Sequence, residues 1–201
     1  LKKKWGALAS TQVVKDDELL DLLRMSGCSY LLLGFESMNN RALTGIHKGF
    51  NRMENYPEVI EKLHSRNITV QGCFIFGFDE DDRHVFSSCL DTINELKIDI
   101  PRYALFTPYP GTPAYRRLKQ DGRLLHEQWE YYDTQHVVLD PLLMSPQELD
   151  SGFKWVWKNT FRVLPSLRRS AAGRTRAPVT FVGNLAYKLY IYRLFTDTDR
   201  F

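Results

Sequence analysis

The sequence predicts an α/β protein built on a parallel sheet and followed by a helical extension. Short apolar runs alternate with helical patterns over residues 1–125. The connections between the runs are long enough for the crossovers that parallel strands require. Ser29–Leu33 is a continuous apolar run, which is typical of a strand buried on both faces. These observations fit either an open sheet or one rolled into a barrel.

Each element has its own local signal. A helix is predicted from Asp16 because two acidic residues lie in its first turn, and Gly27 ends it. Pro57 suits the first turn of a later helix. The expected strands are residues 5–10, 29–34, 68–76 and 100–106. The expected helices are residues 16–26, a short one after Asn39, and residues 56–66, 83–97 and 114–120.

The pattern changes after residue 125, so we divide the chain into a barrel part, residues 1–125, and an extension, residues 126–201. In the extension, Ser145–Glu148 has the form of an N-cap, a first-turn proline and an acid, and predicts a helix to about Val163. Residues 165–180 are rich in Pro, Gly, Ser and Arg and are predicted to be a loop. An aromatic-rich helix is expected over residues 185–195.

Composition excludes several classes of protein. Hydrophobic residues make up 43% of the chain and charged residues 25%, which is ordinary for a globular protein. No run of eighteen apolar residues and no signal-peptide pattern occur. The three cysteines lack metal-binding spacing and fit a reducing, cytoplasmic location, and the histidines form no i,i+3 or i,i+4 pair. We therefore expect no metal site formed by this chain alone.

Charge is distributed unevenly. Residues 1–153 carry 17 basic and 22 acidic side chains, whereas residues 154–193 carry nine basic side chains and no acidic one. Aromatic residues interleave with these cations. The segment 154–195 can therefore be a peripheral membrane contact, a cover for the sheet, or a docking surface for another domain. No nucleic-acid-binding module is present, so nucleic acid is not an expected partner.

The strand ends are where ligands bind in parallel α/β folds. Gly34-Phe-Glu36-Ser37 follows the second apolar run, Gly72 to Glu80 spans the end of the third, and Thr107–Pro113 follows the fourth. Glycine lets a backbone approach a ligand closely, and proline holds a loop in one shape. Taken separately, each of these signals is also typical of an ordinary turn.

Taken together, these strand ends resemble the second half of a radical S-adenosylmethionine (SAM) enzyme, whose fold is a partial parallel (β/α) barrel. The family patterns are G-x-E-S, a Gly/Ile/Gly run with a trailing Glu, and T-P-x-P-G-T; here the second has one extra residue between Gly72 and Ile75. Lys48 fills the place of a basic residue that reaches the SAM carboxylate. Trp129–Asp133 and Met144–Leu149 resemble segments of the branch that carries a cobalamin-binding domain ahead of the barrel.

The resemblance, which covers roughly residues 5–165, implies a site and its cofactors. Glu36 would bond ribose hydroxyls or the methionyl amino group, Lys48 would pair with the carboxylate, and Ile75 with the backbone at Gly77 would hold the adenine. The cofactors implied are SAM, a 4Fe–4S cluster and cobalamin on a preceding domain. The candidate SAM-binding residues are Gly34, Glu36, Ser37, Lys48, Gly72, Ile75, Gly77, Thr107 and Pro108.

One departure from the family is serious, because the C-x3-C-x2-C motif that holds its cluster is absent. We expect a truncated chain whose cluster ligands lie upstream, so that the missing N-terminal half is a partner. An inactive homologue and cluster ligation by other means are the alternatives. The implied function is radical chemistry, such as methyl transfer, on an unactivated carbon of a small-molecule or lipid substrate. The rival hypothesis is a non-catalytic α/β binding module that acts through its basic aromatic tail.

Overall fold

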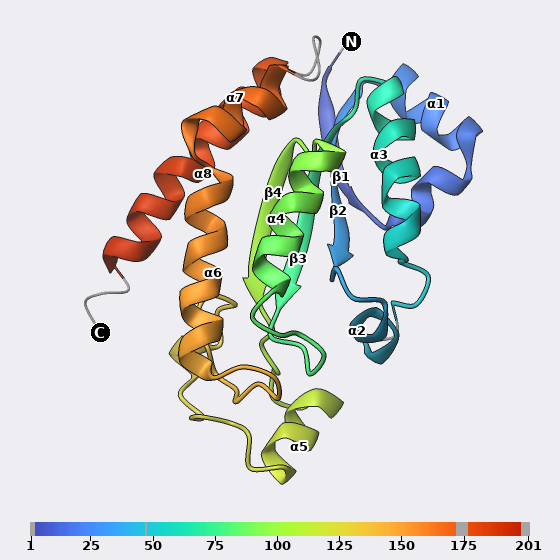
Figure 1. Cartoon of the computed structure of the whole chain (residues 1–201). Coiled ribbons are helices and arrows are strands. Elements are labelled where there is room, and N and C mark those ends of the chain that lie inside the picture. The colour runs from blue at the N-terminus through green and yellow to red at the C-terminus, as the bar shows by residue number, and fades with distance from the viewer. Residues whose placement is uncertain (1–2, 47, 172–176, 198–201) are drawn as a thin grey trace.

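The computed structural model describes residues 3–46, 48–171 and 177–197 (Figure 1). Its centre is one four-stranded parallel sheet in the order β1-β2-β3-β4, with no reversal of direction or order. This order confirms the α/β prediction and is the order of a βα-barrel, in which right-handed crossovers add strands in sequence. The strands are β1 (Trp5–Ala9), β2 (Cys28–Glu36), β3 (Thr69–Phe76) and β4 (Ile100–Leu105).

The helices that follow the strands lie close to their expected positions. Beyond the lower edge of the sheet in Figure 1, where the strand arrows end, lie α2 and α5. The α-helices of this part are α1 (Asp17–Met25), α2 (Asn40–Gly45), α3 (Tyr56–Ser65), α4 (Val85–Leu96) and α5 (Pro113–Gln120). Three 3-10 helices, η1 (Thr11–Lys15), η2 (Met53–Asn55) and η3 (Trp129–Tyr131), were not expected.

The described part of the extension contains, besides η3, the α-helices α6 (Pro146–Thr160), α7 (Val163–Ala171) and α8 (Ala177–Asp197). The predicted loop over residues 165–180 is therefore wrong, although residues 172–176 lie outside the described part. Pro165 and Pro178 fall in the first turns of α7 and α8, where a helix does not need their missing N–H groups. The last helix accordingly begins at Ala177 instead of Leu185.

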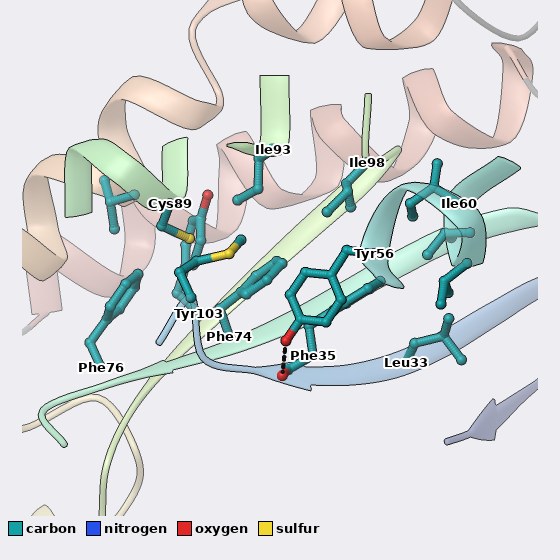
Figure 2. Packing of buried hydrophobic residues seen from close by; sticks show 14 of the residues in the cluster. Leu33, Phe35, Tyr56, Ile60, Phe74, Phe76, Cys89, Ile93, Ile98 and Tyr103 are labelled. Carbon is teal, nitrogen blue, oxygen red and sulfur yellow. Dashed lines mark hydrogen bonds between the residues drawn. The ribbon is translucent and has the colours of Figure 1, made fainter. Parts of the chain in front are cut away.

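The hydrophobic core fills the space between one face of the sheet and the helices. Figure 2 shows Phe35, Phe74, Phe76 and Tyr103 on this face, with Tyr56 of α3 among them. The Phe35 ring stacks on Phe74 at 5.5 Å and meets Tyr56 edge-on at 4.7 Å. Because successive strand residues point to opposite faces, their neighbours form the other face.

We call that other face the luminal face, and its residues include Gly34, Cys73 and Arg102, which lie side by side in the strand register. Ile75 and Ala104 form the next pair toward the carboxyl ends. This face is the one that a barrel encloses. In the described part of the chain, no helix has both the length and the apolar character needed to cross a bilayer.

Candidate functional site

The carboxyl end of β2 is held in an unusual conformation. Glu36 has a φ of 70°, in the left-handed region that residues other than glycine and asparagine rarely adopt. The Ser37 amide donates to the Phe35 carbonyl at 3.0 Å, and the buried Tyr56 hydroxyl lies 2.9 Å from the carbonyl oxygens of both Phe35 and Ser37. Figure 2 shows the bond to Phe35. This turn and the contacts of Tyr56 from α3 hold the strained residue in place.

Asn51 joins this strand end to the loop that carries Lys48. Its side-chain amide donates to the Gly34 carbonyl at 2.8 Å and to the Phe35 carbonyl at 3.3 Å. Its backbone N–H donates to the Lys48 carbonyl at 2.8 Å, and its side chain is also bonded to Thr11. Asn51 is only 2% exposed. Its buried hydrogen bonds therefore tie the Lys48 loop to the end of β2.

Glu36 and Lys48 form an ion pair over the luminal face. The Lys48 Nζ lies 3.5 Å from the Glu36 Oε1, and the side chains are 42% and 16% exposed respectively. A Cβ added at Gly34 would collide with the Glu36 carboxylate, so the carboxylate lies directly over Gly34. Glu36 therefore lies on the face opposite the Phe35 ring and the helix layer. This placement is the one that the predicted SAM site requires.

The end of β3 is organised by Asp81. Its Oδ2 accepts hydrogen bonds from the amides of Gly77 at 3.0 Å and Phe78 at 3.1 Å. Gly77 needs to be glycine because its φ is 103° and because a Cβ there would press on Leu149 of α6. The two amides are therefore already bonded within the protein.

Burial of Asp81 raises the pKa of its carboxyl group to about 6, although the two amide bonds act in the opposite direction. Its second oxygen, Oδ1, is buried and has no hydrogen-bond partner in the structure. Nearby, the Asn39 side chain donates to the Glu80 carbonyl at 3.3 Å and thereby ties the loop after β2 to the loop after β3.

The loop after β4 completes the same edge. The Phe106 amide donates to the Phe76 carbonyl at 2.8 Å, and the Thr107 hydroxyl donates to the Leu105 carbonyl at 3.1 Å. Thr107 and Pro108 are buried. Thr112 then caps α5 by accepting a bond from the Tyr115 amide at 3.2 Å. The carboxyl ends of three neighbouring strands therefore carry the predicted residues.

Gly72 and Ser37 are, like Gly77, candidate residues that do not point into the lumen. Gly72 points toward the helix layer, where a Cβ would lie 3.0 Å from Ile98 and 3.2 Å from Phe35, so glycine is needed there for packing. Ser37 is 2% exposed, and its hydroxyl accepts a bond from the Asn39 amide at 3.0 Å. Ile75 is half-buried on the luminal face, next to Ala104.

The luminal residues fit SAM, whereas the thiols do not fit an iron–sulfur cluster. A facing carboxylate and ammonium complement the amino and carboxylate groups of SAM, and Gly34 leaves the space that the Glu36 carboxylate occupies. Within the described residues, no three His, Cys, Asp or Glu side chains lie together as a metal site would require. Burial raises the pKa of the Cys73 thiol to about 11, and the pKa values of Cys28 and Cys89 are also raised, which disfavours the thiolate forms that bind iron.

Arg102 is a luminal residue that the sequence motifs do not single out. It lies on β4 beside Cys73 and lines a cavity of about 320 Å³ with Gln135, Tyr187 and Tyr190. Tyr187 also accepts a hydrogen bond from the Gln71 side chain at 2.6 Å, so α8 closes the luminal face along the β4 edge. Only the alternation of residues along β4 could have indicated its orientation.

Curated relatives share extended similarity with the chain. It is 34% identical over 166 residues to a bacteriochlorophyllide d C-12(1)-methyltransferase of Chlorobaculum tepidum, covering 83% of this chain and 36% of the relative. A bacteriochlorophyllide d C-8(2)-methyltransferase of the same organism is 29% identical, over 77% of this chain and 36% of the relative. The chain thus spans little more than a third of these relatives. No protein-family model matches it.

Solved structures share its fold. A structure of the radical SAM methyltransferase TsrM from Kitasatospora setae, with cobalamin and a [4Fe-4S] cluster bound, matches with a TM-score of 0.52 and 21% identity, over 74% of this chain and 30% of that one. The Escherichia coli radical SAM enzyme HemN, a coproporphyrinogen III oxidase, matches with a TM-score of 0.55 and 17% identity, over 78% and 32%. With the strand order, these similarities show that the described part of the chain has the fold of radical SAM enzymes.

Proposed function

We propose that this chain is the SAM-binding part of a radical SAM methyltransferase that acts on an unactivated carbon. Two of the relatives are named as methyltransferases of bacteriochlorophyllide d, and a third, 29% identical over 59% of this chain, is named as a hopanoid C-2 methylase. The similarity extends beyond the sheet, since it covers 83% of the chain.

The observation that carries this proposal is the Glu36–Lys48 pair over Gly34. Glu36 accepts hydrogen bonds from the amino group or the ribose of SAM, and Lys48 attracts its carboxylate. Ile75 offers an apolar surface to the adenine beside the Gly77 turn. When bound, SAM supplies a methyl group or, on one-electron reduction, radical chemistry. The protein's part is to hold SAM in one orientation away from water.

The same proposal includes two further cofactors. A 4Fe–4S cluster would need ligands other than the three buried or half-buried thiols of this chain. Cobalamin is proposed because the TsrM structure contains it and because the segments Trp129–Asp133 and Met144–Leu149 resemble the cobalamin-carrying branch. Arg102 gives the lumen a positive charge that an anionic group on a small substrate could meet.

An anaerobic assay tests the proposal. The complete gene product, reconstituted with iron and sulfide, is incubated with SAM, methylcobalamin, a low-potential reductant and bacteriochlorophyllide d. We expect a product in which a methyl group replaces one hydrogen. S-adenosylhomocysteine should form from the SAM that donates the methyl group, and 5′-deoxyadenosine and methionine from a second SAM that takes the hydrogen after one-electron reduction. The Glu36→Gln variant should lower kcat/KM at least tenfold, which corresponds to about 1.4 kcal/mol, the order of one charge-assisted hydrogen bond. Glu95→Gln on α4 is the matched control.

The alternatives give different results in the same assay. An anaerobic magnesium-protoporphyrin IX monomethyl ester cyclase of Cereibacter sphaeroides is 27% identical over 75% of this chain, so cleavage of SAM without methyl transfer would favour a ring-forming reaction. If SAM is neither bound nor cleaved, the non-catalytic binding module becomes the better account. Equal activity of the Glu36 variant and its control would remove Glu36 from the site.

A further inference from the structure

A large groove lies away from the luminal face. It measures about 1160 Å³ and runs between α4, the end of α6, the start of α7, and α8. Figure 1 shows α6, α7 and α8 together on the side of the sheet next to β4. The apolar residues of its wall are Leu90, Phe161, Val163, Leu164, Pro165, Ile191, Tyr192 and Phe195.

One side of α8 exposes an apolar stripe next to this groove. Val182, Leu185, Leu189 and Tyr192 recur at i, i+3, i+7 and i+10, and are 64%, 47%, 61% and 73% exposed. The opposite side of the helix is buried: Asn184 is 2% exposed and donates to the Asp99 carbonyl at 2.8 Å. The stripe is therefore an outward face of a helix that is firmly packed on its other side.

The exposed face of α7 extends the stripe across the groove. Val163, Leu164 and Leu167 are each about half exposed or more. The same helix is anchored by the buried Arg169, which donates to the Thr160 carbonyl at 2.7 Å and to the Asn184 side chain at 2.6 Å. The exposed apolar side chains of α7 therefore belong to a helix that buried hydrogen bonds hold against α6 and α8.

Cations border this apolar surface. Lys158, Arg162 and Lys188 line the groove, and no acidic residue occurs anywhere in the segment 154–193. Arg162 and Lys188 make no ion pair with any residue that the structure describes. Long basic side chains can keep their apolar stems on such a surface while the charged ends reach anionic groups.

We propose that this face of α7 and α8, with the groove between them, rests on an anionic lipid bilayer. An exposed apolar stripe bordered by Lys and Arg is the pattern of an interfacial helix, and anionic headgroups complement its charge. A second copy of this chain would bring the same cations against one another, which opposes a symmetric dimer through this face. Binding would place the apolar side chains at the boundary between headgroups and acyl chains.

Vesicle co-sedimentation of the complete gene product tests this proposal. Vesicles containing phosphatidylglycerol should bind it, pure phosphatidylcholine vesicles should bind it much more weakly, and high salt should release it. The charge-reversing variant Lys158→Glu/Lys188→Glu should lose at least about tenfold in affinity, because each cation near an anionic surface contributes severalfold. Leu185→Asp/Leu189→Asp should lose binding at any salt. The matched control, Lys4→Glu/Lys15→Glu, changes the same charge near β1 and should bind normally.

Circular dichroism and thermal melting first establish that each variant is folded. Equal binding to neutral and anionic vesicles, or equal loss in the control variant, would overturn the proposal. Absence of vesicle binding would also overturn it, and if the protein then sediments as a dimer that the Leu185 and Leu189 changes dissociate, the face is an interface between copies. SAM binding takes no part in these measurements, so their failure leaves the proposed function intact.

Discussion

Glu36 shows how the site combines strain with chemistry. A left-handed backbone at a residue other than glycine costs on the order of 1–3 kcal/mol. The buried partners Tyr56 and Asn51 bond the carbonyl groups on either side of it and offset that cost. The conformation places the Glu36 carboxylate over Gly34, facing Lys48. Backbone strain here therefore has a clear consequence for the position of a charged group.

Gly34→Ala tests this arrangement. The new methyl group would occupy the space of the Glu36 carboxylate and push it away from Lys48. We expect the dissociation constant for SAM, measured by equilibrium dialysis on the complete gene product, to rise at least about tenfold. The fold should survive, because a flexible side chain can move. Gly45→Ala is the control, since no atom lies within 4 Å of the added Cβ there; equal effects of the two changes would contradict the account.

Asp81 should make stability depend on pH. Folding raises its pKa from 3.8 to about 6, so the folded state prefers the protonated form. Its stabilising contribution is therefore complete below pH 3.8 and is lost as the pH rises through 6. Between pH 4 and pH 7 the free energy of unfolding of the wild type should fall by about 2 kcal/mol relative to Asp81→Asn.

Urea unfolding at both pH values measures the Asp81 contribution. Asp91→Asn, an exposed position on α4, provides the control and should follow the wild type. A wild type whose stability relative to Asp81→Asn rises with pH would show that Asp81 is not destabilised by burial.

For individual residues, the sequence predicts the charged groups of the site but not the buried residues that hold the surrounding backbone in place. Glu36 and Lys48 follow from the resemblance of the strand-end motifs. Asn51, Tyr56 and Asp81 do not, because their bonds are made across a tertiary structure that no local pattern specifies. Gly72 was included with the ligand residues, yet its neighbours show that it is a packing position.

Among the elements, α6 joins the extension to the barrel part through close contacts with α4 and with the turn after β3. Gly152 of α6 faces the Phe86 ring of α4, and a Cβ at that position would overlap the ring. Leu149 of the same helix touches Gly77. The helix start is secured by a capping box between Ser145 and Glu148. The helix thus braces both α4 and the turn after β3.

Gly152→Ala should destabilise the protein despite the higher helix propensity of alanine. The propensity gain is about 1 kcal/mol, whereas overpacking against a buried ring costs about 1–3 kcal/mol and forces α4 and α6 apart. Urea denaturation should show a net loss of stability. Ser151→Ala, one residue earlier on the exposed side of α6, should change little; a stabilised Gly152→Ala variant would show that the two helices are loosely packed.

The elements were predicted correctly where the hydrophobic periodicity is strong. The prediction was wrong where prolines in the first turn of a helix were interpreted as loop residues. The four strands and the helices between them have clear apolar runs and end signals. Residues 165–180 contain Pro165 and Pro178, which argue for a loop by composition. In the structure both prolines occupy first turns, and Gly183 is used for close approach of α8 to Ile100. Tertiary packing therefore outweighs local preference here.

For the whole molecule, the described sheet has an unpaired edge at β1. Leu8 on this strand is 80% exposed, which is unusual for a leucine in a parallel sheet. The isolated 201-residue chain should therefore self-associate, as light scattering after size exclusion would measure. Leu8→Lys should shift it toward the monomer, whereas Leu22→Lys on the exposed side of α1 should not. A monomeric wild-type chain at high concentration would contradict this expectation.

Hydrogen–deuterium exchange of the complete gene product, with and without SAM, tests the central claim most directly. We expect SAM to slow exchange in peptides that cover residues 34–51, 72–81 and 104–112, since these form one edge of the sheet around Glu36 and Lys48. Peptides from residues 154–171 and 177–195 should be unchanged, and Glu36→Gln should abolish the effect. Protection confined to the α7–α8 face, or unchanged protection in the Glu36→Gln variant, would contradict the placement of the SAM site at these strand ends.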